Sequence, residues 1–151
     1  MITQEQMQKL NIGGIDYFWK ELMHKIDDND YWTILRALWI DDGVCNDLWY
    51  ILLFYSKRKR EHKIMKSSDR QALKKLPKKI TIYRGCKDKT DEKKWNWSTD
   101  KSFVKKYIST MGDGWYIAER TIDKSDIFAY FNSRKESEVL LKPKEQTNEQ
   151  F

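Results

Sequence analysis

The period of the apolar positions divides the chain into a helical first half and a strand-rich second half. Up to about residue 76, apolar side chains recur every three or four positions, most clearly in DYFWKELMHKI (16–26), YWTILRALWI (31–40) and LWYILLFY (48–55). This spacing predicts amphipathic helices. We expect the third of them to continue into the basic residues that follow it.

Residues with capping chemistry stand at the expected helix ends. Asp30 and Asp47 precede the second and third apolar stretches, and Ser68 begins a further short helical segment. At such a position a side-chain oxygen can accept a hydrogen bond from a backbone N–H of the first turn. Pro77 then ends the helical half, because proline has no N–H to donate and clashes with the preceding turn.

After Pro77 the period changes from that of helices to that of strands. Short alternating, β-branched or aromatic stretches predict five strands, in the order KITIYRG, KWNWSTD, WYIAERTI, DIFAYF and SEVLL. Between the second and third of these, KSFVKKYIST (101–110) has helical spacing. We therefore predict an α+β protein, with a helical N-terminal half packed on a small, mostly antiparallel β core.

The length of 151 residues favours a single domain. Within it we expect a helical part over residues 1–76, with a basic segment at 57–79. A β-rich part that carries the chemistry follows over residues 77–142. The last residues, 143–151, are expected to form a loose tail.

Positive charge is concentrated in the basic segment. Residues 57–79 hold eleven Lys/Arg against two Asp/Glu, whereas the first fifty residues hold four Lys/Arg against nine Asp/Glu. A block of this kind is typical of a surface that binds a polyanion. A solvated helix and linker face explains it at least as well, so charge alone assigns no partner.

Nothing in the sequence points to metals, disulfides or membranes. The cysteines Cys45 and Cys86 and the histidines His24 and His62 form no metal-ligand spacing. The first residues lack a secretory signal, and the longest apolar run has eight residues, whereas roughly 20 are needed to cross a bilayer. We expect a cytoplasmic protein with free thiols, no metal and no membrane partner.

Three short motifs of the strand-rich half carry candidate chemistry. Arg84 ends the first predicted strand, and its guanidinium can hold a phosphate, while Gly85 lets the backbone turn closely behind it. Ser98 follows the second strand with a small hydroxyl, as does the next residue, Thr99.

The third motif is a pair of carboxylates, Glu136 and Glu138, one residue apart at the start of the last strand. On a strand, residues two apart point to the same face, so the alternation predicts that the two side chains lie side by side. Such a pair suits a site that binds a sugar and stabilises a cation.

Each motif alone also has a structural explanation. A strand-end arginine is commonly a surface ion-pair residue. A Ser-Thr-Asp sequence before a helix is an ordinary N-cap, and Asp100 is expected to cap the helix that follows it. Two neighbouring glutamates can be a solvated strand edge. The choice between a structural and a functional role therefore rests on the order of the three motifs along the chain.

That order resembles the R-S-E pattern of mono-ADP-ribosyltransferases, in the branch of cholera-toxin-like and arginine-modifying enzymes. The matching text is YRG (83–85), WST (97–99) and ESEVLL (136–141). It covers roughly the C-terminal half, and ESEVLL is its most specific piece. The layout also looks like small phage and prophage proteins of the same superfamily.

The resemblance implies that the chain uses NAD as a substrate. Arg84, with Gly85 behind it, is then expected to hold the NAD phosphates and ribose. Ser98, with Thr99 in support, is expected to brace the nicotinamide pocket and the catalytic carboxylate. Glu138 is expected to be that carboxylate, which stabilises the cation formed as nicotinamide leaves.

The resemblance also implies a macromolecular acceptor. Glu136 is expected to position or deprotonate the acceptor nucleophile. Phe131 and Arg134 occupy the position of the family's target-recognition loop and are expected to contact the acceptor. The Glu-x-Glu motif favours a protein arginine, whereas the basic segment leading to the Arg84 strand suits a base of RNA or DNA. We weigh these two acceptors about equally.

Several expectations remain open. The interval from Arg84 to Glu138 is short for the family, so Tyr107, Trp115 and Tyr116 all qualify as the aromatic residue that stacks on nicotinamide. A small enzyme of this type is expected to act as a toxin or effector in conflict between phages and bacteria, and a toxin implies an antitoxin as partner. Two alternative functions are a non-catalytic nucleic-acid-binding module and an NAD glycohydrolase.

Overall fold

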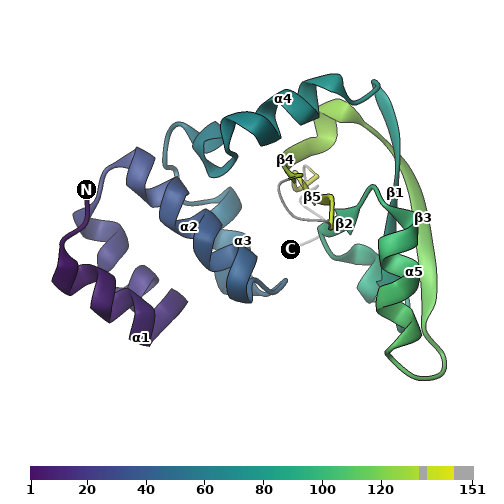
Figure 1. The fold of residues 1–151 in the computed structure, drawn as a ribbon, viewed down its shortest axis with the longest axis horizontal. Coiled ribbons are helices and arrows are strands. Elements are labelled where there is room, and N and C mark those ends of the chain that lie inside the picture. The colour runs from purple at the N-terminus through teal and green to yellow at the C-terminus, as the bar shows by residue number, and fades with distance from the viewer. Residues whose placement is uncertain (133–135, 145–151) are drawn as a thin grey trace, which may run out of the picture. The chain divides into compact units, whose positions relative to one another are not determined.

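The computed structural model describes residues 1–132 and 136–144. The chain divides into two compact units, 1–66 and 67–151. The first unit is helical, and the second carries the sheet (Figure 1). The division falls ten residues before the expected one, because the short helix ahead of Pro77 packs on a strand of the second unit.

The first unit is built from three helices and two short 3-10 turns. They are α1 (Gln4–Lys20), η1 (Leu22–Lys25), α2 (Asp28–Asp42), α3 (Asp47–Phe54) and η2 (Glu61–Ile64). The core is strongly aromatic and buries Phe18, Leu22, Tyr31, Trp32, Leu35, Trp39, Trp49, Leu52, Leu53 and Ile64. The apolar period therefore predicted the buried face of the unit correctly.

The helix starts differ from the expected caps by a few residues. The side chains of Asp27 and Asn46 accept hydrogen bonds from the backbone N–H groups of Asp30 and Trp49, at 2.8 and 2.9 Å. Asp27 and Asn46 are therefore the N-caps of α2 and α3, and Asp30 and Asp47 lie inside the first turns. Negative charge is also favourable there, because it faces the positive end of the helix dipole.

The basic segment at 57–79 is divided between the two units and is not one helix. Helix α3 ends at Phe54, and Lys57 and Arg60 adopt left-handed backbone conformations with φ of 60° and 65°. The expectation that α3 continues into this segment is thus wrong. Residues up to 66 belong to the first unit and those from 67 to the second.

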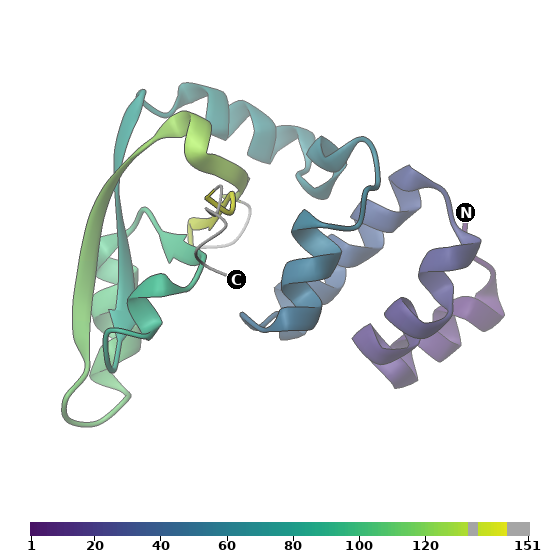
Figure 2. The same ribbon diagram turned by 180° about the vertical axis from the view of Figure 1, so that it is seen from behind.

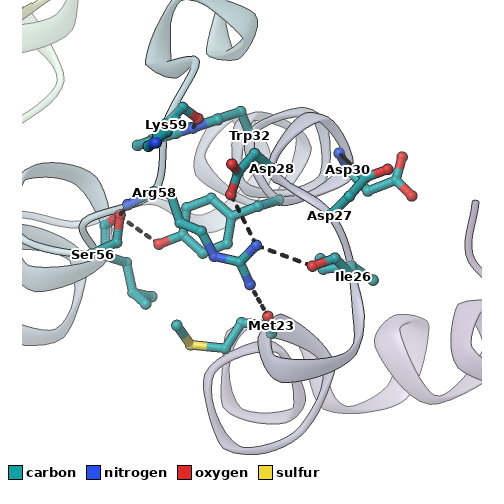
Figure 3. Close-up of polar contacts among 11 residues, drawn as sticks. Met23, Ile26, Asp27, Asp28, Asp30, Trp32, Ser56, Arg58 and Lys59 are labelled. Carbon is teal, nitrogen blue, oxygen red and sulfur yellow. Dashed lines mark hydrogen bonds and ion pairs between the residues drawn. The ribbon is translucent and has the colours of Figure 1, made fainter.

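Arg58 turns inward and holds the first unit together (Figure 3). Its Nη1 atom donates to the carbonyl of Ile26 at 3.0 Å and to the carboxylate of Asp28 at 3.2 Å. Its Nη2 atom donates to the carbonyl of Met23. The guanidinium also lies 4.8 Å from the ring centroid of Tyr31. Only 20% of the side chain is exposed, so this residue of the basic segment is structural.

The second unit consists of a five-stranded sheet with helices around it. Its elements are α4 (Ser67–Lys75), β1 (Lys79–Cys86), η3 (Asp91–Lys93), β2 (Asn96–Ser98), α5 (Lys101–Ser109), β3 (Tyr116–Asp123), η4 (Lys124–Asp126), β4 (Ile127–Phe131) and β5 (Glu138–Leu141). The strand order is β3-β1-β2-β5-β4, and every neighbouring pair is antiparallel. The α+β prediction is confirmed, as are the five strands and the helix between the second and third.

The strands β1 and β3 form the longest strand pair, and α5 lies alongside this pair (Figure 2). Their register runs from Lys79 opposite Asp123 to Cys86 opposite Tyr116. The core of this unit buries Ile80, Ile82, Trp97, Val104, Ala118, Ile122, Ala129, Tyr130, Val139 and Leu140. Among the described residues, no helix is long and apolar enough to cross a membrane.

Replacing Arg58 with lysine is expected to destabilise the first unit by roughly 1–3 kcal/mol, because an ammonium cannot reproduce the fork of donors that meets three oxygens. The free energy of unfolding from urea titration measures this loss. Lys59→Ala is the matched control, since that side chain is exposed. Equal stability of the two variants would contradict a structural role for Arg58.

Candidate functional site

A pocket of about 340 Å³ opens in the second unit. This volume lies at the lower end of the ~300–1,000 Å³ that is usual for small-molecule sites. Five residues singled out in the sequence line it, namely Arg84, Gly85, Ser98, Glu136 and Glu138. The structure thus brings all three sequence motifs together in one cavity.

Strand pairing explains why the motifs meet. β2 lies between β1 and β5, and Ser98 pairs with Tyr83 on one side and with Glu138 on the other. Arg84 follows Tyr83 directly, so the backbones of the three motifs stand almost in one row across three neighbouring strands. Adjacent strands are about 4.8 Å apart. Residues that are 54 positions apart in the sequence, Arg84 and Glu138, therefore line the same pocket.

The side chain of Arg84 on β1 donates hydrogen bonds to β2. Its Nη1 atom donates to the backbone carbonyl of Asn96 at 2.5 Å and to the side-chain oxygen of the same residue. Its Nε atom is buried and has no hydrogen-bond partner among the described residues. A buried guanidinium N–H without an acceptor is costly. Arg84 is therefore suited to bind an anionic group that enters the pocket.

Gly85 acts through packing rather than through a turn. It remains in β1, opposite Ile117, and does not turn the chain behind Arg84 as expected. A Cβ atom at this position would lie 2.5 Å from a methyl group of Ile108 on α5. The missing side chain therefore lets α5 approach β1 closely, which brings Tyr107 of α5 to the pocket wall.

Ser98 fastens the segment that carries the two glutamates. Its side chain is 5% exposed. The hydroxyl donates to the carbonyl of Glu136 at 2.6 Å and accepts from the backbone N–H of Asp100 at 3.0 Å. The backbone N–H of Thr99 donates to the carbonyl of Ser137 at 3.1 Å. Thr99 thus supports the site through its backbone.

The two glutamates share the pocket for a different reason than strand alternation. Strand β5 begins at Glu138, and Ser137 before it has φ of 45°. This left-handed conformation is uncommon for a residue with a side chain and costs of order 1 kcal/mol. The turn at Ser137, held by Ser98 and Thr99, therefore aims Glu136 at the cavity from outside the strand.

Asp69 holds the other end of the same segment. This residue of α4 is fully buried, and its carboxylate accepts a hydrogen bond from the backbone N–H of Asn132 at 2.9 Å. Asn132 follows directly on β4, so Asp69 fixes the point where the chain leaves that strand. Nothing in the sequence marked Asp69, because its partner lies 63 residues away.

The remaining expected residues fall elsewhere. Asp100 is the N-cap of α5, since its side chain accepts from the N–H of Phe103 at 3.1 Å, and that expectation is confirmed. Phe131 is 1% exposed and packs in the core. A buried side chain cannot reach an acceptor, so we no longer assign Phe131 that role. Arg134 lies outside the described residues.

Two charged residues that the sequence analysis did not single out form an ion pair in the pocket wall. Lys94 and Asp91 both line the cavity, and their charged groups are 2.9 Å apart. The backbone N–H of Lys87, followed by the ammonium of Lys94, lowers the pKa of Asp91 to about 2. Asp91 is therefore an anion at any working pH. Cys86 stands close by, but burial raises the pKa of its thiol and keeps it protonated.

Two of the three candidate stacking residues line the pocket. Tyr107 and Trp115 contribute to its wall, and their ring centroids are 6.4 Å apart in an edge-to-face arrangement. Tyr116 is not among the lining residues. Its hydroxyl bonds the carboxylate of Glu92, and this bond raises the pKa of Tyr116 to about 12.

The basic segment does not extend to this cavity along β1. Lys79 begins the strand and Arg84 lies five residues further on, a separation of about 16 Å at 3.3 Å per residue. The lysine of the pocket lining, Lys94, comes instead from residues 87–94, which contain η3 and are called the η3 segment. In the described part of the chain, no group of three or more His, Cys, Asp or Glu side chains is arranged to hold a metal ion.

Comparison with protein-family models, with curated proteins and with solved structures finds no match to the chain.

Ser98→Ala is expected to lower the free energy of unfolding by roughly 1–3 kcal/mol, because it leaves the Glu136 carbonyl and the Asp100 N–H without their partner. Ser102→Ala provides the control, since Ser102 is exposed on α5. Denaturant titration of both variants measures the difference. If Ser98→Ala is as stable as Ser102→Ala, the hydroxyl does not hold the glutamate segment.

Proposed function

We propose that the protein is a mono-ADP-ribosyltransferase, which moves ADP-ribose from NAD to a macromolecular acceptor. One observation carries the proposal: an arginine, a serine and a glutamate from three neighbouring strands line a single pocket, in the order that resembles the R-S-E enzymes. If the two glutamates formed only a solvated strand edge, neither the burial of Ser98 nor the positive φ of Ser137 would be explained.

The pocket chemistry suits the nicotinamide end of NAD. Arg84 has an unpaired buried N–H and a permanent charge, which fit a phosphate oxygen. Tyr107 and Trp115 offer ring faces or edges to the flat nicotinamide. A cavity of about 340 Å³ holds part of the dinucleotide, so the adenosine end extends beyond it.

Glu138 is assigned the central chemical role. The bond between nicotinamide N1 and ribose C1′ breaks, the electron pair leaves with nicotinamide, and C1′ becomes cation-like. The carboxylate of Glu138 accepts a hydrogen bond from the ribose 2′-hydroxyl and stabilises this positive charge. An acceptor lone pair then forms the new bond to C1′, and the acceptor proton passes to Glu136.

The acceptor is a protein arginine or a nucleic-acid base. Glu136 reaches the pocket from the turn before β5, where it can meet an incoming nucleophile. The small size and the resemblance to phage and prophage proteins favour a toxin or effector in phage–bacterium conflict. An antitoxin is then the expected partner.

Two other functions use the same residues differently. In an NAD glycohydrolase, water replaces the acceptor, and no label from NAD becomes attached to a macromolecule. In a non-catalytic nucleic-acid-binding module, the glutamates have no chemical role, and Glu138→Gln leaves function intact. Both are separated from the transferase by one labelling experiment.

In that experiment, the purified protein is incubated with cell lysate and NAD labelled in the adenylate phosphate. Macromolecular label is then counted after digestion with protease or with nuclease. We expect label with the wild-type protein and a loss of about 100-fold or more with Glu138→Gln, because a neutral amide stabilises the C1′ cation poorly.

Glu119→Gln is the matched control, because Glu119 is exposed on β3 and does not line the pocket. It is expected to label acceptors at the wild-type rate. Absence of macromolecular label with the wild-type protein, or equal label with Glu138→Gln and Glu119→Gln, would overturn the proposal.

A further inference from the structure

We infer that the acceptor is single-stranded nucleic acid, which binds along a basic rim beside the pocket. The basic rim consists of four exposed lysines, namely Lys87, Lys89 and Lys93 of the η3 segment and Lys101 at the start of α5. This inference rests on the proposed transferase function and chooses between its two acceptor classes.

The excess positive charge of the chain belongs to the unit that contains the pocket. Residues 1–66 hold ten Lys/Arg and ten Asp/Glu, whereas residues 67–151 hold nineteen Lys/Arg and thirteen Asp/Glu. The formal net charge of +6 is therefore that of the second unit alone. A field of this sign attracts polyanions.

The basic rim adjoins the cavity wall. The η3 segment supplies Lys94 to the pocket lining, and α5 supplies Phe103 and Tyr107. The ammonium of Lys101 lies 5.7 Å from the ring centroid of Tyr83, which also lines the pocket. Lys101 thus lies at the pocket, and the lysines of the η3 segment are neighbours of Lys94 in its lining, so both can contact a backbone phosphate of a strand whose base enters the cavity.

Carboxylates in the same two segments are occupied by the fold. Asp88 accepts from the backbone N–H groups of Thr90 and Asp91. Asp91 is paired with Lys94, Glu92 accepts from a tyrosine hydroxyl, and Asp100 caps α5. The acidic groups are therefore turned to local backbone and side-chain partners, while the lysines extend into solvent.

An exposed aromatic ring favours an unpaired base over a duplex. Tyr107 is 45% exposed at the pocket wall, next to Trp115. Bases of a single strand can stack on such a ring, whereas those of a duplex are buried in their own stack. Chemistry on a base also requires that the base leave the stack. Tyr107 is thus assigned to the acceptor, and Trp115 to nicotinamide.

Binding is tested first, without NAD, by fluorescence anisotropy of a labelled 15-nucleotide single-stranded RNA and DNA over a series of KCl concentrations. The Lys93→Ala/Lys101→Ala variant is expected to bind roughly tenfold more weakly, and its log–log salt slope is expected to fall by about 1.4, since each phosphate contact contributes about 0.7 on a single strand. Tyr107→Ala is expected to weaken binding roughly fivefold to a hundredfold.

The Lys75→Ala/Lys78→Ala variant is the control. It removes the same charge from exposed positions of the same unit, ahead of β1. It is expected to change affinity less than about twofold. An equal loss in the two lysine variants, or equal affinity for a duplex of the same sequence, overturns the inference, because general attraction to a basic protein then explains the binding.

Transfer from labelled NAD separates this inference from the function on which it rests. Label on the oligonucleotide supports both. Label on arginine-containing polypeptide with none on the oligonucleotide contradicts the inference that the acceptor is nucleic acid. The same result supports the transferase function. Rim-dependent binding of the oligonucleotide with no label on any acceptor supports the binding surface and contradicts the transferase.

Discussion

Two buried polar side chains hold the backbone at the end of β4 and just before the start of β5, where the two glutamates lie. Asp69 accepts from the backbone N–H of Asn132, and Ser98 donates to the carbonyl of Glu136. They are the buried polar residues of the described part of the chain. Because the side chain in each bond is buried, losing the bond leaves an unpaired group whose cost is about 1–3 kcal/mol.

Around this constraint the sheet supplies the rest of the site by register alone. One row of pairing sets Ser98 between Tyr83 and Glu138, and the next residue of β1 is Arg84. A slip of one residue between β2 and β5 would put Ser98 and Glu138 on opposite faces of the sheet. The core beneath the row, with Val139 and Leu140 fully buried, makes such a slip costly, so the hydrophobic pattern also protects the chemistry.

Apolar periodicity and turn residues predicted the elements of the fold, because these signals are local. The five strands, α5 and the cap at Asp100 were all readable in this way. What the sequence could not supply depends on distant pairing. The strand order, the tether at Asp69 and the inward turn of Arg58 are examples, because each rests on contacts between residues far apart in the chain.

The sequence identified which residues belong to the site, but it did not predict how they are arranged. The motifs named Arg84, Ser98 and Glu138 correctly as pocket residues, but strand alternation gave the wrong reason for pairing Glu136 with Glu138. A positive φ at Ser137 is invisible in a sequence where no glycine marks it. The lining residues Asn96, Asp91 and Lys94 also carried no signal, since single polar residues in a loop are common.

The most direct test of the account is the rate of nicotinamide release from NAD in lysate supplemented with the purified protein. Wild-type protein is predicted to release nicotinamide, and Glu138→Gln is predicted to release it at least about 100-fold more slowly while unfolding at the same temperature. Equal release by the two proteins, or none by the wild type, would contradict the claim that this pocket cleaves NAD.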